Sequence, residues 1–270
     1  MFLAWEKIVE QPHSDGHLVQ LYKEGEDAEL VRNVGRFLSE GLRKGDAALV
    51  VANARHRDAF AKEIGPEARS IRFFDSAETL GRLMVRGQPD WDRFKEVIGR
   101  TVEELRESND GGGLLAYGDL VNILWKSRQH AAAIRLEQLW NRLLSRSFFS
   151  MSRSPAAGFS LYCGYSIDPL GGDFQPAALD GILSTHTHMI PSESEGRLET
   201  AIRRALDEVL GEAGRIGARF ETTKSANGRS AWAVIPSGES IALWVRKHFP
   251  EQSEEIFHRA RKHYRELAPV

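Results

Sequence analysis

Three residues that could contact an anion, Arg55, His56 and Arg57, follow the apolar segment Ala47–Ala52. In a phosphate-loop protein, the first core strand leads into GxxxxGK[ST], whose backbone N–H groups cradle phosphates while the lysine neutralises charge. The segment here reads Asn53-Ala54-Arg55-His56-Arg57-Asp58, without a glycine or a Lys-Ser or Lys-Thr pair. That type of cradle cannot form here, so we do not expect ATP hydrolysis. Arg55, His56 and Arg57 could still meet an anion at a helix N-terminus, although an exposed basic helix start is the simpler interpretation.

Tyr117 and Asp119 end another apolar segment, and Arg135 and Glu137 also stand among strongly apolar neighbours. Ligands bind at the C-terminal ends of strands in open α/β sheets, so Tyr117 and Asp119 could line a pocket. A buried charge must be paired, because an isolated one costs several kcal/mol. We therefore expect a mainly structural network of Asp119, Arg135 and Glu137, with ligand binding as the alternative role.

His186 and His188 stand two residues apart, which on a strand would put both rings on one face and could supply two metal ligands. His17 and Cys163 could complete such a site if the fold brings them together. A His-x-His pattern alone is weak evidence, so these remain weak candidates and we expect structural histidines instead of a metal site. Cys163 lies in an apolar segment and is expected to be an inert buried thiol. We assign no catalytic residue and no cofactor.

Trp125 and Trp140 recur with leucines at helical spacing, which is typical of core packing, although an apolar ligand pocket beside Trp125 is an alternative. Basic residues near the C-terminus are interspersed with glutamates, so the pattern indicates a solvated helix and not a nucleic-acid-binding face.

The composition is that of an ordinary globular chain, with 270 residues, 41% hydrophobic residues and a formal net charge of -2. No stretch is apolar enough to span a membrane or to act as a signal peptide. A single cysteine rules out an intramolecular disulfide and suits a reducing compartment. We expect a cytoplasmic protein that contacts no membrane.

Short runs rich in β-branched and aromatic residues alternate with segments of helical period. This alternation predicts an α/β fold, in which a mostly parallel sheet has helices on both faces. The predicted strands are His17–Tyr22, Ala47–Ala52, Ile71–Phe74, Leu114–Tyr117 and Phe159–Cys163. The predicted helices include those centred on Leu30–Leu42, Phe94–Leu105 and Ile134–Leu143.

The pattern changes after Pro191, so we predict a domain over residues 1–193 and a C-terminal extension over 194–270. The extension begins with a helix whose apolar stripe is Leu198, Ile202, Ala205 and Val209. A hairpin over residues 220–235 and a further helical segment follow. A stripe of this kind needs a partner. The chain's own core could cover it, but we predict a homodimer through residues 194–270.

Several strings in family order resemble the MEDS sensory domain, named for methanogens, methylotrophs and a dichloromethane-responsive regulator. They lie between about residues 14 and 193 and are HLVQLY (17–22), FLSEGL (37–42), NARHR (53–57), YGDLVNILW (117–125), RLEQLWN (135–141), FSLYCGY (159–165) and HTHMIP (186–191). One departure is Asp119, where family members commonly carry glutamate.

The resemblance implies a domain related to KaiC and RecA ATPases that has lost the phosphate loop and senses small molecules. We therefore expect a non-catalytic sensory or regulatory protein that binds a small molecule or a signalling partner and relays the signal. The ligand-binding candidates are Arg55, His56, Tyr117, Asp119, Trp125, Arg135 and Glu137. Alternatives are an ATP-binding or ATP-hydrolysing RecA-like protein and a ligand-free scaffold.

Overall fold

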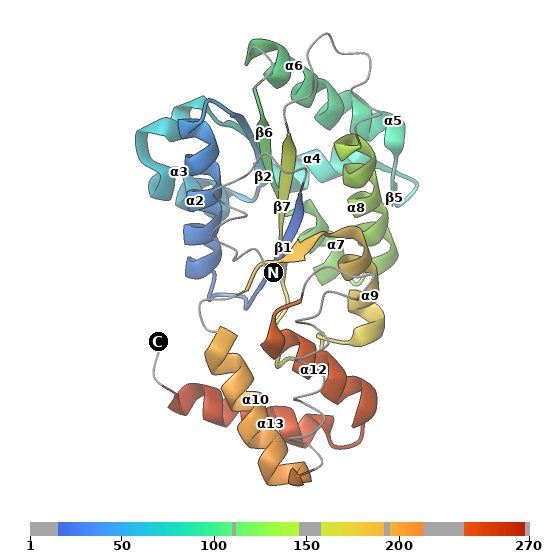
Figure 1. The fold of residues 1–270 in the computed structure, drawn as a ribbon. Coiled ribbons are helices and arrows are strands. Elements are labelled where there is room, and N and C mark those ends of the chain that lie inside the picture. Colours follow the sequence, from blue (N-terminus) through green and yellow to red (C-terminus); the bar gives the residue numbers. More distant parts are fainter. Residues whose placement is uncertain (1–15, 110–111, 146–157, 192–194, 213–234, 268–270) are drawn as a thin grey trace. The chain divides into compact units, whose positions relative to one another are not determined.

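A computed structural model describes residues 16–109, 112–145, 158–191, 195–212 and 235–267 (Figure 1). The chain forms two compact units. The first contains residues 26–166 with the segment up to Gln20, and the second contains residues 167–270 with Leu21–Gly25. The predicted boundary near Pro191 stays a prediction, and the predicted hairpin over 220–235 lies almost wholly outside the described residues.

The larger sheet has six strands in the order β3-β2-β6-β7-β1-β8, which confirms the predicted α/β class. The pairings of β2 with β3, of β2 with β6 and of β6 with β7 are all parallel. Parallel strands buried on both faces consist of nearly continuous apolar residues, which explains why the sequence reveals them. The strands are β1 (His17–Tyr22), β2 (Ala47–Ala52), β3 (Arg72–Asp75), β6 (Leu114–Gly118), β7 (Phe159–Ser166) and β8 (His188–Met189).

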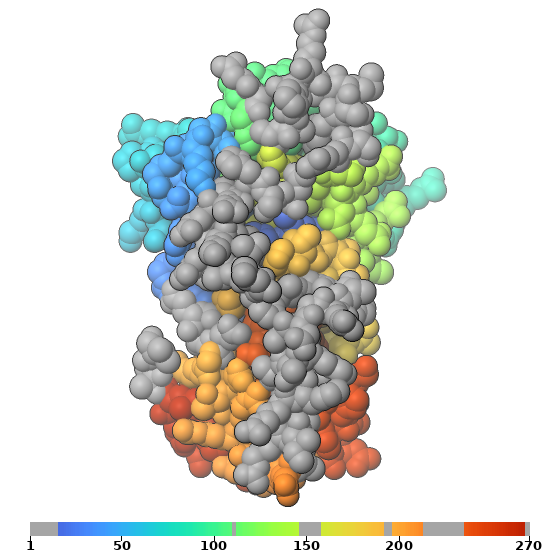
Figure 2. Space-filling view, in the orientation of Figure 1, coloured from blue at the N-terminus to red at the C-terminus, as the bar shows by residue number. Residues whose placement is uncertain are grey.

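Helices cover both faces of this sheet in the first unit, so the fold is a three-layer α/β arrangement. Helices α2 and α3 lie on one side of the strands, and α7 and α8 lie on the other (Figure 1). In the space-filling view, α2 and α3 form the blue and cyan surface and α8 contributes the green surface opposite (Figure 2). The bounds are α2 (Ala28–Arg43), α3 (Ala54–Ile64), α4 (Ser76–Leu83), α5 (Trp91–Phe94), α6 (Arg100–Ser108), α7 (Leu120–Lys126) and α8 (His130–Leu144).

The helix predicted around Phe94–Leu105 is interrupted. A π-helical segment, Lys95–Gly99, joins α5 to α6, so three short elements replace one regular helix. Between α4 and α5, the two-residue strands β4 (Met84–Val85) and β5 (Gln88–Pro89) pair antiparallel. Their turn uses Arg86 and Gly87, both with positive φ.

The core between sheet and helices is aromatic at the centre of β6 and β7. The ring of Tyr117 is fully buried and lies edge-on to Phe60, with 4.8 Å between centroids. A Cβ atom on Gly164 would lie 2.5 Å from the Tyr117 hydroxyl oxygen. Gly164 therefore makes the space that this buried tyrosine occupies.

The second unit contains α9 (Pro176–Thr185), α10 (Glu195–Leu210), α12 (Ser237–His248) and α13 (Ser253–Glu266). The α10 stripe predicted to need a second chain is covered by its own unit, because α10 packs against α12 and α13. Leu198, Ile202 and Ala205 are buried in the single chain. The alternative that the chain's own core covers the stripe is therefore confirmed, and dimerisation itself stays a prediction. Within the described ranges, no helix has both the length and the apolar character needed to cross a membrane.

Candidate functional site

The first candidate site lies where β2 and β6 end beside each other in the first unit. The backbone N–H of Asp119, just after β6, donates to the Val51 carbonyl oxygen in β2 (3.1 Å). On the β2 side, Asn53 caps α3 by accepting a hydrogen bond from the His56 backbone N–H (3.0 Å). The side-chain amide of Asn53 donates to Asp119 Oδ2 (2.9 Å). Two strand ends are thus joined by polar side chains, as expected at the C-terminal edge of a parallel sheet.

His56 lies between two carboxylates and is itself buried. Its Nδ1 atom is 3.1 Å from Asp119 Oδ2, and its Nε2 atom is 3.2 Å from Asp27 Oδ2. The guanidinium of Arg55, exposed on α3, donates to the other oxygen of Asp27 (2.7 Å). We call Asp27, Asn53, Arg55, His56 and Asp119 the strand-edge cluster.

One oxygen of the strand-edge cluster is not used within the described part of the chain. Asp119 Oδ2 accepts from the Asn53 backbone and side chain, whereas the buried Oδ1 has no hydrogen-bond partner among the described residues. Asp119 also precedes α7 at its N-cap position but does not cap it by a side-chain hydrogen bond. A buried acceptor without a partner is costly, so this oxygen marks a place where a ligand could donate a hydrogen bond.

The structure shows that the position of a phosphate loop would be after β1, whereas the sequence-based prediction placed it after Ala47–Ala52. The first strand of the described residues is β1, so the loop that corresponds to a phosphate loop follows Tyr22 and not Ala52. That loop reads Lys23-Glu24-Gly25-Glu26-Asp27 and also lacks a Gly-Lys-Ser or Gly-Lys-Thr triplet. After β2, moreover, the N-terminus of α3 is already capped by Asn53 and faces Asp119. Acidic side chains at this edge disfavour a phosphate group.

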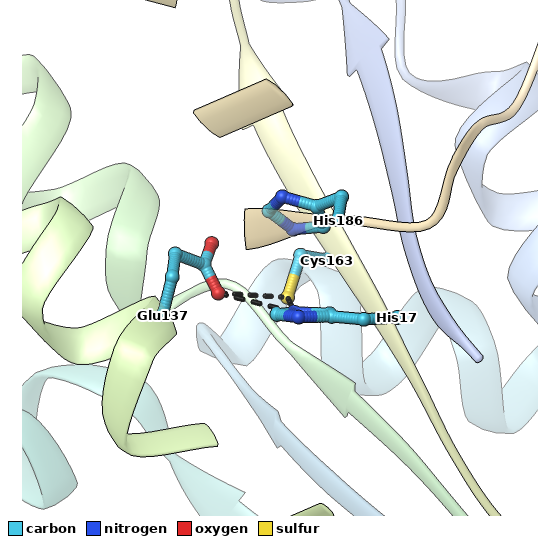
Figure 3. Close-up of side chains that lie close together, drawn as sticks. All are labelled: His17, Glu137, Cys163 and His186. Atoms are coloured by element: carbon cyan, nitrogen blue, oxygen red, sulfur yellow. Dashed lines mark hydrogen bonds and ion pairs between the residues drawn. The ribbon is translucent and has the colours of Figure 1, made fainter. Parts of the chain in front are cut away.

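A second cluster in the first unit combines His17 from β1, Glu137 from α8 and Cys163 from β7, all fully or almost fully buried (Figure 3). We call these three residues the His–Glu–Cys cluster. His17 Nε2 is 3.2 Å from Glu137 Oε2 and 3.3 Å from Cys163 Sγ. The Cys163 Sγ atom lies 3.6 Å from the same Glu137 oxygen. Three chemically different groups therefore converge on one point.

Neighbouring side chains fix the orientation of this cluster. His17 Nδ1 is 2.8 Å from Asn141 Oδ1, a contact in which the ring nitrogen donates. The hydroxyl of Tyr165 donates to Glu137 Oε1 (2.6 Å). Burial, and then the charge of Glu137, raise the pKa of the Cys163 thiol and of the Tyr165 hydroxyl. The buried thiol is therefore protonated near neutral pH, which disfavours nucleophilic catalysis by Cys163.

The predicted network of Asp119, Arg135 and Glu137 is wrong, because the fold sends the three side chains to different partners. Asp119 belongs to the strand-edge cluster and Glu137 to the His–Glu–Cys cluster. The Arg135 guanidinium donates instead to the carbonyl oxygen of Pro89 in β5 (2.6 Å). Asp119 and Glu137 are buried and paired as expected, but each is paired with a histidine and not with Arg135.

The two aromatic ligand-binding candidates lie in the core. Tyr117 packs between Phe60 and Tyr162 in the first unit. Trp125, in α7, stacks on His130 and meets Tyr165 edge-on, with centroid separations of 4.1 and 5.6 Å. Their burial agrees with the packing interpretation of these side chains.

His186 and His188 do not share a strand face, contrary to the geometry expected from their spacing. His186 follows the last residue of α9, where its Nδ1 donates to the Ile182 carbonyl oxygen (2.6 Å). Only His188 lies in β8, and burial lowers its pKa from 6.5. His186, also drawn in Figure 3, belongs with His188 to the second unit.

Sequence reasoning missed two members of the strand-edge cluster, Asp27 and Asn53, as functional candidates. Asn53 carried a readable signal, because an asparagine just before a helix is a common N-cap. Asp27 stands at the same position before α2 but makes no side-chain cap hydrogen bond there, and its contact with His56 joins residues 29 positions apart.

The fold is a three-layer α/β domain that holds two buried polar clusters. Comparison with known families identifies the family to which this domain belongs. A family profile described as "MEDS: MEthanogen/methylotroph, DcmR Sensory domain" matches residues 16–187. The chain belongs to this family of sensory domains, which indicates a sensory or regulatory role. Neither the curated proteins nor the solved structures contain a significant match.

Proposed function

We propose that this protein is a non-catalytic sensor that binds a small molecule at the strand-edge cluster and relays the event to a partner. The observation that carries this proposal is the Asp119 Oδ1 atom, buried at the end of β6 without a hydrogen-bond partner among the described residues. Membership of a sensory-domain family supports the same role.

The chemistry of the strand-edge cluster restricts the ligand. Two carboxylates, Asp27 and Asp119, face one imidazole, His56, and the accessible cation Arg55 is already paired with Asp27. A group that donates hydrogen bonds fits Asp119 Oδ1, whereas a phosphate or carboxylate would be repelled. Small amines, alcohols and amides are therefore the ligand class that suits this site.

A sensor also needs two states that the ligand distinguishes, because binding shifts an equilibrium only by its difference in affinity. The backbone N–H of Asp119 donates a hydrogen bond to β2, and Asp119 immediately precedes α7. The Asp119 side chain accepts a hydrogen bond from Asn53 at the N-terminus of α3. A ligand on Asp119 therefore acts on three elements at once. We assign the relay to a change in the Asp119 contacts that connect β2, α3 and α7.

The test is a thermal-shift screen of the full chain against small amines, alcohols and amides, with ATP and ADP included. A compound that prefers the folded state at 100 times its dissociation constant stabilises the protein by about 2.7 kcal/mol. This corresponds to a rise in melting temperature of several degrees. A rise caused only by the nucleotides would contradict the proposal.

The matched variants are Asp119→Asn and Asp92→Asn. Because the Asn53 N–H groups donate to Oδ2, the new amide oxygen would take that place and the amide NH2 would replace Oδ1. An acceptor thereby becomes a donor, so the shift should vanish. Asp92 is an exposed residue of α5, and its variant should keep the full shift. An undiminished shift in Asp119→Asn would remove the ligand from this site.

A further inference from the structure

The His–Glu–Cys cluster has the dimensions of a metal-binding site. Around tetrahedral zinc, bonds of about 2.0–2.2 Å to nitrogen or oxygen and about 2.3 Å to sulfur place ligand atoms roughly 3.3–3.6 Å apart. The three separations here are 3.2 Å, 3.3 Å and 3.6 Å. His17 Nε2, Glu137 Oε2 and Cys163 Sγ thus already occupy positions close to three corners of one coordination tetrahedron.

We propose that His17, Glu137 and Cys163 bind one divalent transition-metal ion, with zinc as the best-fitting metal. Imidazole, carboxylate and thiolate together suit zinc, whereas magnesium and calcium prefer oxygen ligands alone. This site is separate from the ligand site proposed at Asp119, and either can be correct without the other.

The contacts around the cluster have the form of an outer coordination shell. Because His17 Nδ1 donates to Asn141 Oδ1, the lone pair of a neutral ring is on Nε2, which faces the other two groups. Tyr165 holds Glu137 Oε1, so Oε2 remains directed at His17 and Cys163. Metal-binding histidines and carboxylates are commonly oriented in this way.

Burial fits a metal held inside the domain. The exposed fractions of the side chains of His17 and Glu137 are 2% and 0%, and Cys163 is fully buried. The strands place them there, because Cys163 in β7 pairs in register with Gly118 in β6, and β1 is the next strand beyond β7. A metal would join β1, β7 and α8.

Binding requires the thiolate, so the metal displaces the Cys163 proton to solvent and a metal–sulfur bond replaces the S–H bond. No oxidant or reductant is needed, because the ion keeps its charge. In the absence of metal, the thiol donates to Glu137, and His17 donates to it from Nε2 only when both ring nitrogens carry a proton. Metal binding to that form also releases the Nε2 proton to solvent. The experiment must therefore separate a hydrogen-bonded cluster from a metal site.

The decisive measurement is cobalt(II) titration of chelator-treated full chain, followed by zinc competition. The chain has one cysteine, so any thiolate-to-cobalt charge-transfer band is assigned to Cys163. We expect that band, tetrahedral ligand-field bands saturating at one cobalt per chain, and their loss on addition of zinc. Because this test uses the unmodified protein, it does not depend on whether a variant folds. A protein that shows no thiolate-to-cobalt band would overturn the proposal.

Two variants then test the ligands, and a third is the control. Cys163→Ser should abolish the charge-transfer band, and Glu137→Gln should weaken zinc binding by more than the roughly 10–100-fold typical of an outer-shell change. His258→Gln, on the exposed face of α13, is the matched control and should bind as the unmodified chain does. Circular dichroism verifies that each variant is folded. Unchanged zinc affinity in folded Glu137→Gln would remove Glu137 from the site.

Discussion

The Nε2 atom of His17 lies 3.2 Å from the Oε2 atom of Glu137, and both side chains are buried. The two residues are 120 positions apart, and the contact joins the strand β1 to the helix α8. Such a pair is costly to break from one side, because the remaining group is left buried without its partner. The contact therefore matters for folding whether or not a metal is bound.

Glu137→Leu should lower the free energy of unfolding by about 3–5 kcal/mol, the usual cost of removing one member of a buried pair. The reason is that His17 and the Tyr165 hydroxyl both lose their acceptor. Urea denaturation of chelator-treated protein measures the change. The control is Glu104→Leu on the exposed part of α6, which should stay within about 0.5 kcal/mol. A loss as small as the control's would show that the Glu137 contacts are energetically unimportant.

ATP should be neither bound in the manner of a phosphate loop nor hydrolysed. The loops after β1 and β2 both lack the Gly-Lys-Ser or Gly-Lys-Thr triplet, and Asp119 occupies the edge where phosphate would approach. A coupled assay of ADP release in the presence of magnesium measures turnover. A reaction without protein is the background control. Turnover by the unmodified chain above that background would contradict the prediction.

Ile202→Ala should destabilise the second unit by about 2–5 kcal/mol without changing the molecular mass in solution. Ile202 is fully buried where α10 packs against α12 and α13 of the same chain. Thermal unfolding and light scattering give the two quantities. If the substitution instead halved the mass while leaving the monomer stable, Ile202 would belong to a subunit interface.

The strands were predictable because each is a short apolar run buried between two helical layers. The bounds of β1 and β2 match the prediction, and β3 differs by one residue at each end. The π-helical break at Lys95–Gly99 was not predictable, since its apolar spacing continues that of the adjoining helices. Local periodicity reports burial, and it does not distinguish hydrogen bonds to the fourth residue from those to the fifth.

The candidate sites were predictable as residues but not as constellations. His56, Asp119, Glu137 and Cys163 were all singled out, yet the contacts that join a carboxylate to an imidazole or a thiol span 26 or more positions. Which acidic group pairs with which base depends on strand order, and β1 lies beside β7 although they are the first and fifth predicted strands. Sequence reasoning for this reason paired Asp119 and Glu137 with Arg135 and not with histidines.

His188 should make the protein less stable as the solution becomes more acidic. Burial lowers the pKa of His188 in the folded state below 6.5. As pH falls past that value, the unfolded chain therefore binds more protons than the folded protein does. Stability therefore rises with pH through this window and is fully present above 6.5. Urea denaturation at several pH values, compared with His188→Gln, should show a shallower pH dependence in the variant. Identical pH dependence would mean that His188 titrates alike in both states.

The central claim is that a hydrogen-bond donor on a small molecule binds Asp119 at the end of β6. Isothermal titration calorimetry should be run with the compound that gives the largest thermal shift, on the unmodified chain and on Asp119→Asn. A hydrogen bond to a charged group contributes about 1.5–3 kcal/mol, so affinity in the variant should fall at least roughly tenfold. Saturable binding to the unmodified chain with that loss is the predicted result. Equal affinities of the two proteins would contradict the account.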